Sequence, residues 1–189
     1  MKPYFSVDVE TTGLDRKNDM LLELAAIYED PSIKFSFENI PKFNCFIKHP
    51  EYRGSSAYAF ALNKSIFDEL ICFERNKATT APVYSLEVAI KEFCNFVSKY
   101  TTNPVDQVRF TGKNYASFDH QFLQRDGMDA YIKYNHRFLD IGSLMFDAET
   151  MDWIPSSEEC YGLAGIDKSV SHKALYDAWD AIQIIRTKY

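Results

Sequence analysis

Two acidic residues stand two positions apart at the end of the first apolar segment, residues 4–9. The weak alternation of this segment predicts a β-strand, in which successive side chains point to opposite faces of the sheet. Asp8 and Glu10 therefore share one face, while Val7 and Val9 point into the other. Because like charges this close repel, and a divalent cation is the usual neutraliser, the pair favours a metal site. Two solvated acids at a strand end would leave the same pattern.

The next four residues, Thr11, Thr12, Gly13 and Leu14, are a candidate binding turn. Gly13 would let the backbone approach a ligand closely, and the two threonines offer N–H and hydroxyl donors. A phosphate or a sugar hydroxyl could bind to such donors. An ordinary turn would have the same composition.

A third acid, Asp119, stands near the start of a helix predicted to begin close to Ser117. Phe118 and Phe122 are four residues apart and share one helical face, so Asp119 is flanked by core anchors. An acid in the first turn also stabilises a helix through the macrodipole, which leaves a capping role open. We expect the neighbouring His120 to be a surface or half-buried histidine without a catalytic role.

The last predicted helix, residues 173–187, contains a fourth acid. At 100° per residue Asp177 falls on the edge of the apolar stripe, whereas Asp180 and Gln183 turn away from it. Because a charge is rarely buried alone, Asp177 binds a cation, pairs with a base or borders a cleft. His172, just before the helix, is suited to general-base catalysis, although it could also be a helix-entry histidine without chemistry.

The remaining elements predict an α/β or α+β fold with a mixed sheet flanked by helices. Strands are expected at residues 21–29 and 42–48, with residues 35–38 as a possible short strand between them, and at 107–111 before a Gly112 turn. Helical periodicity marks residues 63–73 and 85–100, the latter capped by Ser85, with a loop at 76–82 between them. Residues 137–140 form a short strand or turn. One domain over residues 1–189 is expected.

Composition excludes several classes of protein. A hydrophobic fraction of 46% and 14 glycines and prolines in total exclude disorder, and the apolar stretches are too short to span a bilayer. Four scattered cysteines without a C-x-x-C pair argue against a disulfide framework or a zinc ribbon, so a cytoplasmic location is expected. The net charge of −6 argues against coating nucleic acid by phosphate neutralisation alone, but not against a nucleic-acid enzyme.

The joint order of these motifs resembles one family. The three motifs are Asp8-x-Glu10-Thr11-Thr12-Gly13, Asn114-x-x-x-Phe118-Asp119-x-x-Phe122-Leu123 and His172-x-x-x-x-Asp177. Together they resemble the DEDDh, or DnaQ-like, 3′→5′ exonuclease superfamily, which includes polymerase proofreading subunits, ribonuclease T and oligoribonuclease. The resemblance extends from Tyr4 to about Arg186. It implies a ribonuclease H-like fold, a five-stranded mixed sheet whose first three strands are antiparallel, with helices on both faces.

The resemblance also implies a mechanism and a set of contacts. Asp8, Glu10, Asp119 and Asp177 would hold two Mg²⁺ or Mn²⁺ ions, and His172 would be the general base. The backbone of residues 11–13 would contact the terminal 3′-nucleotide, Leu14 would wedge against its base, and Asn114 would lie near the phosphate. Asp140 resembles an acid found after the second motif in relatives, and we interpret it either as a support for the site residues or as structural. Lys113 departs from the histidine of many relatives.

The stretch between the first two motifs is longer than in minimal members and rich in aromatic residues: Tyr52, Tyr58, Phe60 and Phe67. Exposed aromatics can stack on bases, although most of these are expected in the core. A strip of basic residues would approach the substrate: Arg16, Lys17, Lys113, Lys168 and Lys173.

The expected function is a metal-dependent 3′→5′ exonuclease acting on single-stranded DNA or RNA ends. The main alternative is a proofreading-type accessory domain that docks on a polymerase or another partner, and a homodimer is also possible. A lesser alternative is a structural calcium site formed by the same acids. The choice between DNA and RNA depends on how the pocket treats a 2′-hydroxyl, which the sequence does not reveal.

Overall fold

A mixed sheet of six strands forms the centre of the structure, a computed structural model that describes residues 2–101 and 108–189. The three long strands β1 (Tyr4–Thr11), β2 (Leu21–Glu29) and β3 (Lys42–Lys48) pair antiparallel in chain order. Three short strands pair parallel to their neighbours: β4 (Val83–Ser85), β5 (Phe110–Gly112) and β6 (Leu139–Asp140). The strand order is β4-β3-β2-β1-β5-β6, so β1 lies inside the sheet.

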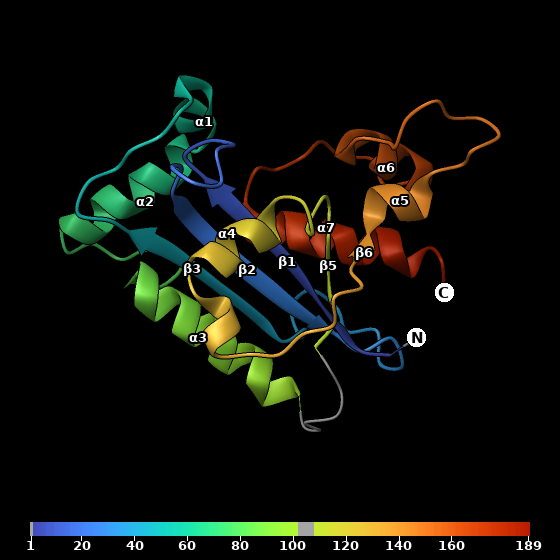
Figure 1. Cartoon of the computed structure of the whole chain (residues 1–189), viewed down its shortest axis with the longest axis horizontal. Coiled ribbons are helices and arrows are strands. Elements are labelled where there is room, and N and C mark those ends of the chain that lie inside the picture. Colours follow the sequence, from blue (N-terminus) through green and yellow to red (C-terminus); the bar gives the residue numbers. More distant parts are fainter. Residues whose placement is uncertain (1, 102–107) are drawn as a thin grey trace.

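Helices cover both faces of this sheet, as Figure 1 shows. On one face pack α3 (Leu86–Tyr100) and α4 (Asp119–Arg125), which a short 3₁₀ turn, η1 (Met128–Ala130), follows. On the other face packs α7 (Ala174–Arg186), together with the short helices α5 (Ile141–Met145) and α6 (Ser157–Ala164). Two further helices, α1 (Ala57–Leu62) and α2 (Lys64–Glu74), lie towards the β3 side of the sheet, where α2 contacts β3.

The alternation of β1 places apolar side chains in two separate cores. Phe5, Val7 and Val9 are buried in the core that α3 and α4 share. Tyr4 points to the opposite face and is buried in the core under α7. Each such side chain contributes about 1.5–3 kcal/mol by its burial. The two acids that follow Tyr4 in the same alternation therefore face α7 rather than solvent.

The predicted α/β fold with antiparallel first strands is confirmed, but the sheet has six strands instead of five. The additional strand is β4, whose three residues pair parallel with the end of β3. The sequence predicted only a loop and a helix cap there. Ser85 does precede α3, but its side chain makes no capping hydrogen bond to that helix.

Several boundaries also differ from the prediction. The possible strand at residues 35–38 is wrong, because this stretch forms turns and loop, from which Phe35 packs on the α7 core. The helices predicted at 63–73, 85–100, about 117 and 173–187 are present as α2, α3, α4 and α7, each starting one or two residues later than predicted. The predicted strand at 107–111 became β5, which includes Gly112, while residue 107 lies outside the described residues. Residues 137–140 contribute only the two-residue strand β6.

Candidate active site

Asp119 lies where β1 runs past its neighbour. The parallel pairing of β1 with β5 ends at Ser6 and Thr111, so the β5-side edge of β1 is unpaired beyond this point. The start of α4 fills this gap, and the backbone N–H of Val9 donates a 3.0 Å hydrogen bond to Oδ1 of Asp119. Asp119 is only 3% exposed. This bond satisfies a buried donor and holds the acid beside Asp8 and Glu10.

Asp177 lies in the first turn of α7, which packs on the face of the sheet opposite to α4. The start of α7 is held by Glu23 of β2, whose Oε2 accepts a 3.2 Å hydrogen bond from the Ala174 N–H. Glu23 stands directly opposite Glu10 in the β1–β2 pairing, so the two side chains share one face of the sheet. Sequence reasoning missed this buried acid. Its only signal was an acid inside an otherwise apolar strand.

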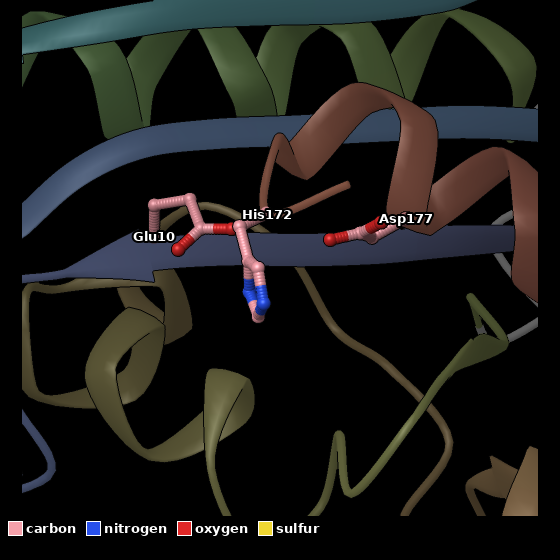
Figure 2. Close-up of side chains that lie close together, drawn as sticks. All are labelled: Glu10, His172 and Asp177. Carbon is pink, nitrogen blue, oxygen red and sulfur yellow. The ribbon is translucent and has the colours of Figure 1, made fainter. Parts of the chain in front are cut away.

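His172 precedes α7 and faces the same acids. Ligand atoms of Glu10, His172 and Asp177 all lie within 4.8 Å of one another. Figure 2 shows the three side chains converging from β1, from the segment before α7 and from α7 itself. The backbone of His172 has φ 49°, a left-handed conformation that non-glycine residues seldom adopt.

One cavity of about 230 Å³ joins these groups. Its lining includes the four predicted acids and the histidine, together with two polar residues that follow β5: Asp8, Glu10, Asp119, Asp177, His172, Lys113 and Asn114. Asn114 is also in a left-handed conformation, with φ 57°, and its N–H donates a 2.6 Å hydrogen bond to Oδ2 of Asp140. Asp140 also caps α5 by accepting the Ser143 N–H at 2.8 Å, which agrees with its predicted structural role.

The candidate binding turn lies outside this lining, and its threonine side chains serve the fold. The Thr11 hydroxyl donates to the Gly13 carbonyl at 2.6 Å, and the Thr12 hydroxyl accepts from the Met20 N–H at 2.9 Å. Thr12 also uses its own N–H, which bonds to the Met20 carbonyl. Leu14 is 79% exposed. The turn can therefore offer a ligand the Leu14 side chain and backbone groups, but not the threonine hydroxyls.

Burial and mutual repulsion dominate the electrostatics of the acids in the cavity. Burial, followed by repulsion from Asp119 and the other acids, raises the pKa of Asp8 well above its ordinary range. Burial and the charge of Glu23 raise the pKa of Glu10 to about 8. Burial also raises the pKa of Asp119 to about 7, although the Val9 N–H opposes this shift. The cluster thus retains protons near neutral pH, and a bound divalent cation would displace them.

The donor set fits a hard divalent cation. Four carboxylates from three separate segments meet at one cavity, and oxygen ligands suit Mg²⁺ and Mn²⁺. The side chains of this set differ in their spacing and burial. The Glu10, His172 and Asp177 atoms form the tightest group, whereas Asp119, at 3% exposed, is the most buried of the four acids.

Two expectations for nearby residues are wrong. His120 is 6% exposed and lies in the core, with its ring 4.9 Å and 4.8 Å from the ring centroids of Tyr134 and Phe138. Asp180 does not turn away from the apolar stripe but is 3% exposed, because α5 and α6 cover a second side of α7.

The basic strip and the aromatic residues are dispersed. Lys113 lines the cavity, but Lys168 forms an ion pair with Asp180. Tyr52, Phe60 and Phe67 pack against one another but are only half-buried, and Tyr58 is 73% exposed, so these residues are not in the core as expected. No helix within the described ranges is long and apolar enough to cross a bilayer.

The sheet topology and the acid-lined cavity are typical of a class of nucleases. The chain belongs to the RNase_T exonuclease family, whose model matches residues 5–185. This family comprises DnaQ-like 3′→5′ exonucleases and uses divalent metals. The ribonuclease H-like fold is thereby confirmed. No curated protein sequence is significantly similar to the chain.

Solved structures with the same fold include Exonuclease I of E. coli. The chain resembles its zinc-bound complex with single-stranded DNA at 17% identity and a TM-score of 0.64, covering 99% of this chain and 40% of that one. Its complex with a dT13 oligonucleotide gives 16% identity and a TM-score of 0.67, covering 98% and 40%. The chain thus spans about two fifths of the length of Exonuclease I, and identities this low establish the fold alone.

Proposed function

We propose that this chain is a metal-dependent 3′→5′ exonuclease that releases nucleoside 5′-monophosphates from the 3′ ends of single-stranded nucleic acid. The observation that carries the proposal is the convergence of four carboxylates and His172 on one cavity. A protein that only docked on a partner would have no physical need to bury several mutually repelling acids together. Binding of dT13 and dA16 oligonucleotides by Exonuclease I supports a single-stranded substrate.

We assign the metal ligands to Asp8, Glu10, Asp119 and Asp177, which would hold two Mg²⁺ or Mn²⁺ ions. Bound ions would stabilise negative charge on the scissile phosphate and favour attack by water. These acids would keep the ions at the end of β1, where the Val9 N–H fixes Asp119.

His172 is the proposed general base. A ring nitrogen of His172 lies within 4.8 Å of carboxylate oxygens of both Glu10 and Asp177, which supports a role next to the proposed metal ligands. It would accept the proton of the attacking water at a ring nitrogen, a step for which a histidine is suited near neutral pH.

Substrate contacts are proposed for the residues next to the acids. Lys113 and Asn114 would meet the phosphates, because both line the cavity. Leu14, which is highly exposed just after β1, would contact the terminal base, and the backbone at Gly13 would approach the terminal sugar. Thr11 and Thr12 would contribute through backbone groups other than the Thr12 N–H, since that N–H and both hydroxyls are already bonded within the turn.

One assay separates this proposal from the docking alternative. Purified chain is incubated with Mg²⁺ or Mn²⁺ and a single-stranded oligonucleotide labelled at its 5′ end, as matched DNA and RNA. Wild type should shorten the strand stepwise from the 3′ end, whereas Asp8→Ala should lose at least about 10³-fold in rate, which is the loss of about 4 kcal/mol of transition-state stabilisation. The control Asp68→Ala changes an exposed acid that forms a surface ion pair, and it should keep full activity.

If wild type were as inert as Asp8→Ala on every strand, the docking domain would be the better explanation. Three expectations stay predictions. Residues 1–189 are expected to form one exonuclease domain, the chain to form a homodimer or bind a polymerase, and the protein to act in the cytoplasm.

A further inference from the structure

The segment between α6 and α7, residues 165–173, carries His172 but contains no helix or strand. Its placement therefore depends on contacts with the rest of the fold. Ile166 and Val170 pack against the core under α7, and the Ser171 N–H and hydroxyl donate to Oδ1 of Asp177 at 3.2 and 2.7 Å. Among the residues that the structure describes, the His172 imidazole has no hydrogen-bond partner, so its position follows from its backbone.

A second polar contact, which lies outside the cavity lining, also anchors this segment. Lys168 Nζ lies 2.6 Å from Oδ2 of Asp180, and the hydroxyl of Tyr161 donates to the same oxygen at 3.0 Å. The Asp180 side chain is 4% exposed and the Lys168 side chain 35% exposed. Because a buried carboxylate is strongly unfavourable without a cation or hydrogen bonds, Asp180 keeps Lys168 in place.

The two anchors differ in what metal binding does to them. Both Ser171 hydrogen bonds go to Oδ1 of Asp177, a proposed metal ligand, so an ion bound to this oxygen would compete with them. Asp180 does not line the cavity, and neither Asp180 nor Lys168 is a proposed metal ligand, so an ion there would not compete directly for this contact. His172 lies four residues after Lys168. Its backbone is in a left-handed conformation, which is unfavourable for a non-glycine residue and must be held by surrounding contacts. The Lys168 contact therefore remains to hold this backbone in the metal-loaded state.

We propose that Lys168 and Asp180 are positioning residues that hold His172 in place for the reaction, an inference that rests on the proposed function. Lys168 acts through the backbone of its segment and not through the substrate. This differs from the expectation that Lys168 belongs to a substrate-binding basic strip. Since misplacement of a catalytic group by about 1 Å can cost about 10²-fold in rate, loss of the contact should lower kcat by about 10- to 100-fold.

The test compares kcat and KM on a single-stranded oligonucleotide for wild type and Lys168→Met. For Lys168→Met we expect kcat to fall by about 10- to 100-fold and KM to stay within about twofold. Lys168→Arg, which keeps the positive charge, should retain most of the wild-type rate. In a His172→Ala background Lys168→Met should cause no further loss. The control Lys64→Met removes a surface Lys–Asp pair of the same 2.6 Å length and should leave kcat unchanged.

Lys168→Met leaves Asp180 without its cation and could weaken folding, so a double variant is needed. Lys168→Met combined with Asp180→Asn has no unpaired charge but also lacks the anchor, and its kcat should be as low as that of the single variant. A rise in KM with unchanged kcat would show that Lys168 binds the strand and would overturn the proposal. An equal loss in the His172→Ala background would overturn it as well.

A readout without substrate separates this inference from the proposed function. In an NMR spectrum of the histidine rings, assigned with His172→Ala, the His172 signal should shift or broaden in Lys168→Met, while those of the other three histidines stay in place. An unmoved His172 signal would refute the positioning role even if the chain is an active exonuclease. A moved signal in a chain without nuclease activity would refute the proposed function alone.

Discussion

Replacing Glu10 by glutamine should stabilise the metal-free protein at alkaline pH, although it should impair catalysis. Burial and the neighbouring charge of Glu23 raise the pKa of Glu10 from an ordinary 4.5 to about 8. Between these two values the folded chain binds more protons than the unfolded chain. The free energy of unfolding therefore falls as pH rises through this window and is highest below it.

The magnitude follows from the two pKa values. A carboxyl with these values lowers the free energy of unfolding by about 1 kcal/mol at pH 5 and by about 4 kcal/mol at pH 8, a difference of about 3 kcal/mol. For a chain of this length about 1 kcal/mol corresponds to about 2–4 °C in Tm, so this carboxyl alone should lower Tm by roughly 6–12 °C between pH 5 and pH 8. Glu10→Gln removes this contribution, because an amide carries no charge.

The assay is thermal unfolding in a chelator at pH 5, 6, 7 and 8, for wild type, Glu10→Gln and the control Glu51→Gln, an exposed acid. We expect Glu10→Gln to melt above wild type at pH 8 and close to it at pH 5, with the control matching wild type throughout. Mg²⁺ or Mn²⁺ should raise the Tm of wild type far more than that of Glu10→Gln, since ligand binding stabilises the state that binds it. A wild-type Tm that rises from pH 5 to pH 8, with Glu10→Gln no more stable than wild type, would refute the reasoning.

Three further predictions follow from local contacts. Gly13→Ala should lower the free energy of unfolding by about 1–3 kcal/mol in urea titrations, because a Cβ there would overlap the Asp19 carboxylate. The control Gly162→Ala, where a Cβ meets open space, should be neutral or stabilising. Equal effects of the two substitutions would contradict the predicted overlap at Gly13. Asp119→Ala should unfold about 1–3 kcal/mol more easily than Asp119→Asn, which can still accept the backbone bond; equal stability of the two inactive variants would argue against that bond. Glu23→Gln should keep the bond to the start of α7 and most of the activity, whereas Glu23→Ala should lose activity; kcat measurements that rank them in reverse would exclude a positioning role for this acceptor.

The elements that carry the proposed metal ligands were predictable because their signals are local. Strand alternation placed Asp8 and Glu10 on one face, and helical periodicity placed Asp177 at the edge of an apolar stripe. The order of the three motifs then indicated that they meet, and the structure does bring them to one cavity. Their roles as ligands and base are proposals that the assays above address.

The features that sequence missed depend on contacts between distant segments. Glu23 matters through its register with Glu10 across β1 and β2, which no local pattern encodes. β4 has three residues, too few for a period-2 signal. Asp180 was misplaced because the helical stripe was judged against one packing face, whereas α6 supplies Tyr161 to a second. His120 is buried by aromatic rings from a loop more than ten residues further along the chain.

The most direct test of the account is the position of bound metal in a crystal soaked in Mn²⁺, located by its anomalous scattering. We predict manganese within coordination distance of Asp8, Glu10, Asp119 and Asp177, in the cavity at the end of β1. In Asp8→Ala crystals treated identically, at least part of this signal should disappear. Strong manganese sites elsewhere on the chain, with none between these four carboxylates at saturating concentration, would contradict it.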